Sequence, residues 1–340
     1  MKKTICCVAG KSGGHIIPCL TYIQYHSTIR DNHILFFSTK SQIDSMIMKS
    51  FPVTVKHVPL AFDGIPTKKT IFGYLRLLVQ LTITTLKTLF YLLYDRPKKI
   101  ISTGGYVAVP VCLIGYLLKI PIELFELNAV PGRAIIFLAR FASVIHTCFP
   151  EAKNALKDYK TDSINYPVRF SHQAIPTRKA ALENLNFSDT KKTILILGGS
   201  QGSLFLNNLI QTACTSSDDF FKNIQIIHQT GECELSIKEF YSLRGINSCV
   251  FSYTPSIEQF YPAADLVICR AGAGTLFETL FFKKKAIIIP LEARTTDHQV
   301  DNALSFQTHH PELFTVLRQN ELLDNPNVFT QQMLLMMGST

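Results

Sequence analysis

Short apolar runs end in glycine-rich turns at several points along the chain. Residues 4–20, TICCVAGKSGGHIIPCL, are typical of a strand, a tight turn and a helix, and residues 191–210, KKTILILGGSQGSLFLNNLI, repeat this pattern. Strand-like and helix-like segments alternate after each of them, as in KIISTGGYVAVPVCLIGYLLKIPIELFELN and ADLVICRAGAGTLFETLFF. Such alternation favours parallel sheets covered by helices. We therefore predict an α/β chain with one doubly wound sheet in each half.

The length of 340 residues favours two domains. We expect the link near residues 165–170, NYPVRF, between an amino-terminal domain at residues 1–168 and a carboxyl-terminal domain at residues 169–340. Ligands of such sheets bind beyond the carboxyl ends of the strands. We expect two facing sheets to form one cleft there, and the glycine turns to gather in it, at residues 10–14, 104–105, 198–202 and 272–274.

The first glycine turn fits neither of two familiar phosphate-binding motifs. A P-loop needs a glycine five places before Gly10-Lys11-Ser12, where the chain has Ile5, and the dinucleotide fingerprint G-x-G-x-x-G is absent. What remains is a helix whose first backbone amides are unpaired, a geometry that favours an anion or a polar ligand. A purely structural turn is the alternative for this motif taken alone.

The composition indicates a folded protein with an acidic partner. Hydrophobic residues make up 47% of the chain and charged residues 17%, and the formal net charge is +9. The candidates are an anionic membrane and a phosphorylated substrate, since no RNA-reading motif supports nucleic acid, and ordinary solvated charge explains most of the basic residues. None of the nine cysteines forms a C-x-x-C pair, so we infer a reducing compartment without disulfides or a zinc site. The first apolar run is too short for a signal peptide.

Residues 71–94, IFGYLRLLVQLTITTLKTLFYLLY, are long enough to cross a bilayer but carry a polar seam. Arg76 and Lys87 project within about 20° of one another on a helix. We predict one or two amphipathic helices here, with part of the apolar face in the core. Basic residues flank the segment, and this favours docking on an anionic membrane: Lys68, Lys69, Arg96, Lys98 and Lys99.

Eight motifs occur in the order and spacing of one protein family: GKSGGHIIP, STGGYVAVP, FELNAVPG, YPVR, LGGSQGS, HQTG, CRAGAGTLFE and DHQVDNA. Over residues 3–305 the chain resembles the bacterial undecaprenyldiphospho-muramoylpentapeptide β-N-acetylglucosaminyltransferases. The resemblance implies a GT-B fold of two Rossmann-like domains that needs no cofactor. It also implies inverting transfer of GlcNAc from UDP-GlcNAc to the C4 hydroxyl of a lipid-linked muramoyl-pentapeptide. Such a peptidoglycan enzyme is peripheral, at the cytoplasmic face of the membrane.

The resemblance also implies a donor site. UDP-GlcNAc would contact Ser12, Gly13, Gly14, Asn128, Arg169, Ser200, Thr254, Ala273, Gly274, Thr275, Leu276, Phe277, Glu278 and Gln299. In this assignment Arg169 and Ser200 face the diphosphate, and Glu278 accepts hydrogen bonds from the ribose hydroxyls. Asn128 and Gln299 contact the sugar.

The chemistry of a leaving UDP agrees with that assignment. Its diphosphate develops negative charge, which a metal or fixed hydrogen-bond donors can offset. The chain has no D-x-D motif, so a metal has no signature here. Helix starts at residues 200–203 and 272–275, with one arginine, would provide the fixed donors. Thr254 matches the family position beside the uracil.

Two residues are candidates for the base that deprotonates the acceptor hydroxyl. His15 follows the first glycine turn at a helix start, where an imidazole tends to stay neutral. Glu126, two places before Asn128, is the rival. A structural role remains open for either.

The chain departs from the family at Phe125 and Leu127, where His and Gln are usual, and at Tyr166, where Asn is usual. Its end after Ala303 is short, so we expect abbreviated last helices and an altered acceptor side. Two alternatives therefore stay open: a related glycolipid transferase with a diacylglycerol acceptor, and a non-catalytic sugar-nucleotide binder. A nicotinamide oxidoreductase is disfavoured because the dinucleotide fingerprint is missing.

Overall fold

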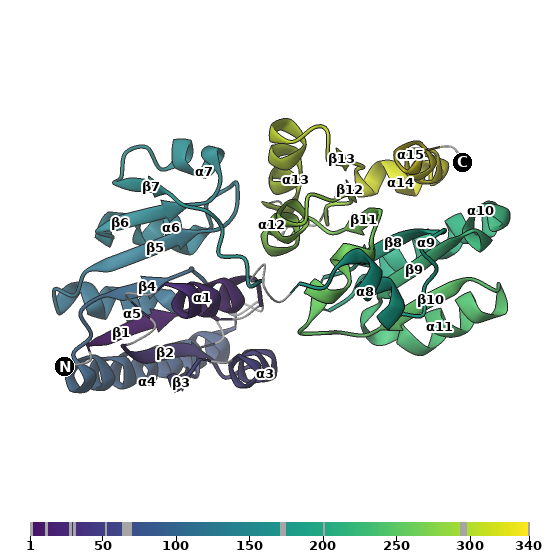
Figure 1. The fold of residues 1–340 in the computed structure, drawn as a ribbon. Helices are drawn as coiled ribbons and strands as arrows, with labels where there is room; N and C mark the ends of the chain where they lie inside the picture. Colours follow the sequence, from purple (N-terminus) through teal and green to yellow (C-terminus); the bar gives the residue numbers. More distant parts are fainter. Residues whose placement is uncertain are drawn as a thin grey trace. The chain divides into compact units, whose positions relative to one another are not determined.

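The computed structural model places two separate α/β units along the chain (Figure 1). The first unit is Met1–Arg169 and the second is Phe170–Thr340. The residues that the structure describes are 3–10, 13–26, 29, 32–51, 53–62, 70–170, 175–199, 201–292 and 298–338.

The first unit is built on a parallel sheet of seven strands in the order β3-β2-β1-β4-β5-β6-β7. Its strands are β1 (Thr4–Val8), β2 (His33–Thr39), β3 (Lys56–Leu60), β4 (Ile100–Ser102), β5 (Ile122–Glu126), β6 (Val144–Thr147) and β7 (Thr161–Ser163). Its helices are α1 (Gly13–Tyr25), α3 (Gln42–Ser50), α4 (Ile71–Asp95), α5 (Ala108–Leu117), α6 (Arg133–Leu138) and α7 (Pro150–Ala155), with a 3-10 turn at Ala139–Phe141.

The second unit repeats this plan with a six-stranded parallel sheet in the order β10-β9-β8-β11-β12-β13. Its strands are β8 (Lys192–Leu197), β9 (Ile224–Gln229), β10 (Asn247–Phe251), β11 (Leu266–Cys269), β12 (Lys285–Ile288) and β13 (Phe314–Val316). Its longer helices are α9 (Leu204–Ser216), α11 (Glu234–Leu243), α12 (Ala273–Phe281), α13 (His298–His309) and α15 (Asn327–Met337). Shorter ones are α8 (Arg178–Asn184), α10 (Asp218–Lys222), α14 (Gln319–Asp324) and 3-10 turns at Gly231–Cys233, Ile257–Gln259 and Tyr261–Ala263.

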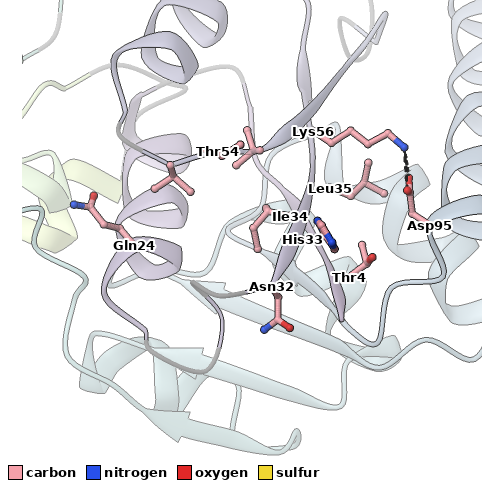
Figure 2. A pocket seen from close by; sticks show the side chains of 11 residues that line it. Thr4, Gln24, Asn32, His33, Ile34, Leu35, Thr54, Lys56 and Asp95 are labelled. Carbon is pink, nitrogen blue, oxygen red and sulfur yellow. Dashed lines mark hydrogen bonds and ion pairs between the residues drawn. The ribbon is translucent and has the colours of Figure 1, made fainter. Parts of the chain in front are cut away.

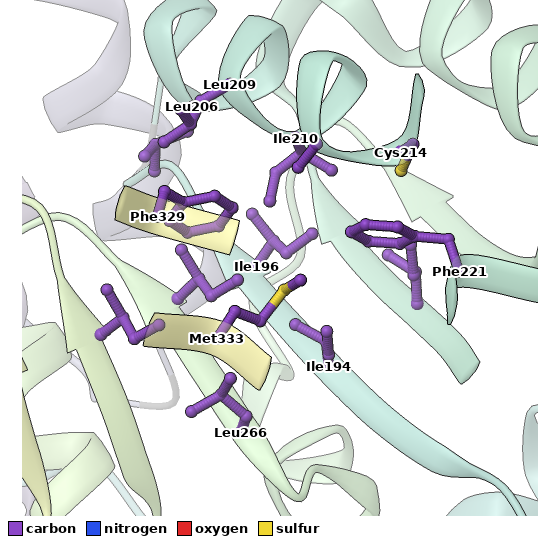
Figure 3. Close-up of a cluster of buried hydrophobic side chains, with 14 of the residues drawn as sticks. Ile194, Ile196, Leu206, Leu209, Ile210, Cys214, Phe221, Leu266, Phe329 and Met333 are labelled. Atoms are coloured by element: carbon purple, nitrogen blue, oxygen red, sulfur yellow. The ribbon is translucent and has the colours of Figure 1, made fainter. Parts of the chain in front are cut away.

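The central strands β1, β8 and β11 are largely apolar and buried, as expected for parallel sheets that helices cover on both faces. In the second unit Ile194 and Ile196 of β8 pack against α9, and Phe329 and Met333 bring α15 into the same cluster (Figure 3). The last helix of the chain is thus part of the core of the second unit. The prediction of one parallel, helix-covered sheet in each half is confirmed.

Helix α4 leaves most of its apolar side exposed. Its buried residues are Thr84, Thr88 and Leu92, and the Lys87 ammonium donates to the carbonyl of Pro59 (2.8 Å). Large apolar side chains face outward: Ile71, Phe72, Leu75, Leu78, Val79, Ile83, Leu86, Phe90, Leu93 and Tyr94. The core therefore takes only a small part of the apolar face. Among the described residues, α4 alone is long and apolar enough to cross a membrane by length and composition.

Candidate active site

The strand order of the first sheet brings two glycine turns together at its carboxyl edge. The chain reverses direction across the sheet between the neighbouring strands β1 and β4, and such switch points are where ligands bind. A Cβ on Gly10 would lie 3.0 Å from Thr39 Cγ2 and 3.1 Å from Val107 Cγ1. Gly105 has φ +84°, and a Cβ there would lie 3.3 Å from the Gly10 carbonyl oxygen. Small residues are therefore required where these two turns meet.

His15 connects the two turns through a pair of hydrogen bonds with Thr103. The His15 Nδ1 lies 2.8 Å from the Thr103 carbonyl oxygen, and the Thr103 hydroxyl donates to the His15 carbonyl (2.9 Å). Because a carbonyl only accepts, Nδ1 carries the proton in this contact. Neutral His15 then has its basic lone pair on Nε2, which is the protonation state that a general base requires.

Glu126 has a different environment at the end of the neighbouring strand β5. Its carboxyl is 2% exposed and accepts from the Asn128 amide (2.9 Å), the Asn128 side chain (3.2 Å) and the Gly132 amide (2.8 Å). Burial raises the pKa of this carboxyl, and these hydrogen bonds oppose the rise. Glu126 thus organises the loop at residues 127–132 and fixes the position of Asn128.

The remaining candidates of the first unit lie near the start and the end of α1. Gly13 and Gly14 form the first turn of that helix, with Gly13 buried and Gly14 exposed. Arg169 is the last residue of the first unit, and the Tyr25 hydroxyl donates to its carbonyl (3.2 Å). Ser12, and Ser200 of the second unit, lie outside the described residues.

A glycine turn with the same place in the second sheet follows β8. Gly199 and Gly202 have φ +88° and +75°, a backbone region that glycine adopts without strain. A Cβ on Gly202 would lie 2.5 Å from the Thr230 carbonyl oxygen and 2.6 Å from Gly231 Cα, so this turn packs directly on the loop after β9. Ser203 ends the turn, and its hydroxyl caps α9 by accepting from the Leu206 amide (3.3 Å).

Arg270 lies at the carboxyl end of β11, next to β8 in the sheet. It is 7% exposed, and it donates to Ser203 Oγ and to the carbonyls of Ile289 and Pro290. Burial lowers the pKa of its guanidinium to about 10. Our sequence reasoning missed Arg270 and Thr103. The signal for Arg270 is a single charged residue between a buried strand and the small residues AGAG.

Helix α12 holds six of the predicted donor-site residues, from Ala273 to Glu278, directly after this strand. Its N-cap is Gly272, which supplies no side-chain hydrogen bond, so the first amides of the helix have no side-chain cap from that residue. Glu278 is 8% exposed and is therefore not a surface carboxylate.

The other two candidates of the second unit come from separate elements. Gln299, in the first turn of α13, accepts from the Leu291 amide through Oε1 (3.0 Å) and so connects α13 to the segment after β12. Thr254 lies after β10 and accepts from the Ser256 amide (3.1 Å). The structure thus gathers residues 273–278 on one helix, and places Thr254 in a loop and Gln299 in the first turn of another helix.

A groove of about 920 Å³ lies at the opposite, amino-terminal edge of the first sheet (Figure 2). It is lined by the first residues of three strands, Thr4, His33 and Lys56, and by Asp95 at the end of α4. Lys56 and Asp95 form an ion pair of 2.8 Å there. None of the predicted site residues lines this groove, so its size does not make it the candidate site. In the part of the chain that the structure describes, no group of three or more His, Cys, Asp or Glu could hold a metal ion.

Comparisons with known proteins match both halves of the chain. The glycosyltransferase family 28 N-terminal domain matches residues 5–147, and the family's C-terminal domain matches residues 193–333. A relative from Thermosipho africanus is 32% identical over 301 residues, covering 88% of this chain and 82% of its own length. It is named UDP-N-acetylglucosamine--N-acetylmuramyl-(pentapeptide) pyrophosphoryl-undecaprenol N-acetylglucosamine transferase. A relative of the same name from Myxococcus xanthus is 29% identical, covering 86% of this chain and 75% of its own length.

Solved structures share the fold. The crystal structure of Acinetobacter baumannii MurG has a TM-score of 0.73 at 23% identity, covering 99% of this chain and 91% of its own. The UDP-GlcNAc 2-epimerase of Methanocaldococcus jannaschii has a TM-score of 0.66 at 13% identity, covering 99% and 93%. At these identities the likeness shows the fold alone, and the second of these proteins is named for a different reaction.

Proposed function

Because the chain belongs to glycosyltransferase family 28, we propose that it transfers N-acetylglucosamine from UDP-GlcNAc to the C4 hydroxyl of a lipid-linked muramoyl-pentapeptide. The observation that carries this proposal is the 32% identity to a named transferase over 88% of the chain, with both family domains matched. The product would be the disaccharide precursor of peptidoglycan. The same comparisons favour an active enzyme over a non-catalytic sugar-nucleotide binder.

His15 is the base in the proposed reaction. Its Nε2 accepts the proton of the C4 hydroxyl while that oxygen forms a bond to the anomeric carbon and the bond from this carbon to UDP breaks. The anomeric configuration inverts because attack and departure occur on opposite faces. The hydrogen bond from Nδ1 to the Thr103 carbonyl supports this role because it keeps the lone pair on Nε2 and stabilises the imidazolium once formed. Glu126 supports the reaction by holding the loop that carries Asn128.

The donor nucleotide would occupy the carboxyl edge of the second sheet. The first amides of α9 and α12 are fixed donors for an anion, and an anion is favoured at both helix amino termini. Glu278, with acceptor oxygens only when ionised, suits a pair of ribose hydroxyls. Arg169 and Ser200 would face the diphosphate, Thr254 the uracil, and Asn128 and Gln299 the sugar.

The identity of the acceptor is tested by comparing two lipids. Radiolabelled UDP-GlcNAc is offered with the muramoyl-pentapeptide lipid or with diacylglycerol in the same detergent. We expect label only in the muramoyl lipid. Label in diacylglycerol alone would assign the chain to glycolipid synthesis, and label in neither lipid, with UDP still bound, would favour the non-catalytic binder.

Membrane docking through α4 belongs to the same proposal, since the acceptor is a lipid. The exposed apolar side of α4 resembles that of helices that lie in the membrane interface. Arg96 and Lys98 are exposed just past its end, whereas Lys99 pairs with Glu123 (2.9 Å) and is not available to lipid. Lys68 and Lys69, expected at the other end, lie outside the described residues.

Vesicle sedimentation tests this docking. The protein should bind phosphatidylglycerol vesicles more than phosphatidylcholine vesicles, with partial release at high salt. Leu86→Glu with Phe90→Glu should abolish binding because both side chains are exposed on the apolar side of α4. Leu235→Glu is the matched control, an exposed leucine of the second unit. Equal binding by the α4 variant and the control would remove α4 from the membrane contact.

A further inference from the structure

Arg270 and Ser203 lie on the two sides of the switch point in the second sheet. Ser203 follows β8, Arg270 follows β11, and these two strands are neighbours where the chain reverses direction across the sheet. Ligands of doubly wound sheets bind in the crevice outside the carboxyl ends of such a strand pair. A side-chain bridge at this place is therefore next to the ligand position that the topology favours.

One N–H group of the Arg270 guanidinium has no acceptor among the described residues. Its Nη1 donates to the carbonyls of Ile289 (3.1 Å) and Pro290 (3.3 Å), and its Nε donates to Ser203 Oγ (3.1 Å). Its Nη2 makes one such bond, also to Ser203 Oγ (2.9 Å). Since Nη2 carries two N–H groups, one of them has no acceptor among the described residues. This donor lies beside the Ser203 hydroxyl.

The hydroxyl of Ser203 is likewise left with a proton to donate. Its oxygen accepts from Nε and Nη2 of Arg270 and from the Leu206 amide. No acceptor for its own proton lies among the described residues. A hydroxyl oxygen has two lone pairs, which the guanidinium and the amide approach here, so its proton points away from both groups. The same small region thus offers an O–H group and an N–H group to a ligand.

The charge at this place favours an anion. Arg270 is 7% exposed and has no carboxylate partner in the described ranges, and a buried cation without a counter-charge is costly. The amino terminus of the 13-residue helix α9 adds partial positive charge, because Ser203 is its N-cap. An anion bound here would offset both.

We propose that the Ser203 hydroxyl donates a hydrogen bond to the diphosphate of the nucleotide sugar, and that Arg270 is the positioning residue that orients this hydroxyl. The inference rests on the proposed function, because that function supplies the diphosphate. It adds to that function a contact from a residue at the helix cap, beyond the glycine turn.

Titration calorimetry with UDP and with uridine tests the proposal, since uridine lacks the phosphates. Ser203→Ala should weaken UDP binding about ten- to a hundredfold, the range for a hydrogen bond to a charged group, and leave uridine within about twofold. Ser203→Thr, which keeps the hydroxyl and the cap, should restore UDP affinity. Arg270→Lys should lower UDP affinity while keeping the positive charge, because a lysine lacks the planar fork that holds Ser203.

Thr177→Ala is the control for losing a helix cap. Thr177 caps α8 in the same unit by accepting from the Ala180 amide (3.3 Å), so this variant should lose stability without losing UDP affinity. The proposal is overturned if Ser203→Ala binds UDP as the wild type does, or if it loses UDP and uridine affinity equally. Wild-type protein that binds neither compound would overturn the UDP-GlcNAc donor itself, which distinguishes failure of the proposed function from failure of this inference.

Discussion

The two units build the same kind of edge from different side chains. In each sheet the turn after the first strand contacts the turn after its neighbour across the switch point: His15 with Thr103 in one, Ser203 with Arg270 in the other. The first contact joins Nδ1 of an imidazole to a backbone carbonyl. The second contact joins a buried cation to a hydroxyl and favours an anion. The strand order thus places both contacts at a switch point, where ligands of such sheets bind, and a few side chains set the chemistry that each edge offers.

The two units also differ in how much of their polar and apolar surface is buried. At the second edge Arg270 is 7% exposed, and in the same unit α15 packs into the core. The first unit carries α4, whose apolar side is exposed over most of its length. A buried polar contact suits a soluble nucleotide. An exposed apolar helix suits docking on the membrane that would hold a lipid acceptor. The following experiments test this comparison in order of the size of the expected effect.

Removing the imidazole at the first edge should have the largest effect. His15→Ala should lower turnover by about 10²–10⁴-fold with UDP affinity nearly unchanged, because the base acts on the acceptor and not on the nucleotide. Steady-state kinetics with saturating UDP-GlcNAc, together with UDP titration, would measure both quantities.

Glu126→Gln is the matching variant for the rival base. It keeps the size of a side chain that organises residues 127–132, so it should lower turnover less than His15→Ala does. If Glu126→Gln loses 10²-fold or more while His15→Ala loses less than about tenfold, the base is Glu126. The contact of His15 with Thr103 would then be structural only, and the first edge would not supply the base.

Glu278→Ala should lower the affinity for the nucleotide. Loss of the ribose contact should weaken both UDP and uridine by about 1.5–3 kcal/mol, the range for hydrogen bonds to a charged group. This pattern differs from that of Ser203→Ala, which should spare uridine, so calorimetry with the two ligands separates ribose from diphosphate. Wild-type affinity for both ligands in Glu278→Ala would remove Glu278 from the nucleotide site.

Most of the scaffold could be predicted from the sequence because parallel strands are buried on both faces and leave long apolar runs. The strands β1, β8 and β11 are of this kind, whereas β9 is buried along its length but half polar. β3, KHVPL, was not singled out because it is short and half of it is polar and partly exposed. The polar seam of α4 was visible in the sequence, but which side packs on the sheet depends on the tertiary partners of Thr84 and Thr88.

The candidate site was predictable in position but not in chemistry. Glycine turns after strands located both edges, because backbone at φ near +80° requires glycine whatever surrounds it. The tautomer of His15 and the donors of Arg270 depend on partners 88 and 67 positions away in the chain. No local pattern encodes such contacts, and for this reason the sequence favours His15 as the base but leaves its rival Glu126 open.

Acid should destabilise the second unit through His228, which lies in β9 just before the loop that contacts the glycine turn. His228 is 0% exposed, and burial lowers its pKa to about 3. An unfolded histidine titrates near 6.5, so below that pH the unfolded chain binds a proton that the folded chain excludes. The free energy of unfolding should therefore be highest above pH 6.5. It should fall by up to about 1.36 kcal/mol for each pH unit below it.

Hydrogen exchange of the β9 amides between pH 7 and pH 4, corrected for intrinsic rates, measures this slope. His228→Gln should reduce the slope even if it lowers stability at every pH. His309→Gln, an exposed histidine of the same unit, is the control and should keep the wild-type slope. Equal slopes in wild type and His228→Gln would show that the buried ring does not set the acid sensitivity of this unit.

The smallest expected effect concerns the side of α4 that faces the first sheet. Thr84 and Thr88 are 0% exposed, and their hydroxyl oxygens have no hydrogen-bond partner in the part of the chain that the structure describes. A buried hydroxyl without a partner destabilises the folded state, and valine replaces it with a methyl group of similar size. Thr84→Val should therefore raise the free energy of unfolding by up to about 1 kcal/mol in urea titrations.

Thr82→Val is the control, since Thr82 is exposed and donates to the Leu78 carbonyl (2.9 Å), and it should change stability by less than about 0.5 kcal/mol. If Thr84→Val lowers stability instead, the hydroxyl has a partner and the polar side of α4 does not pack dry against the sheet.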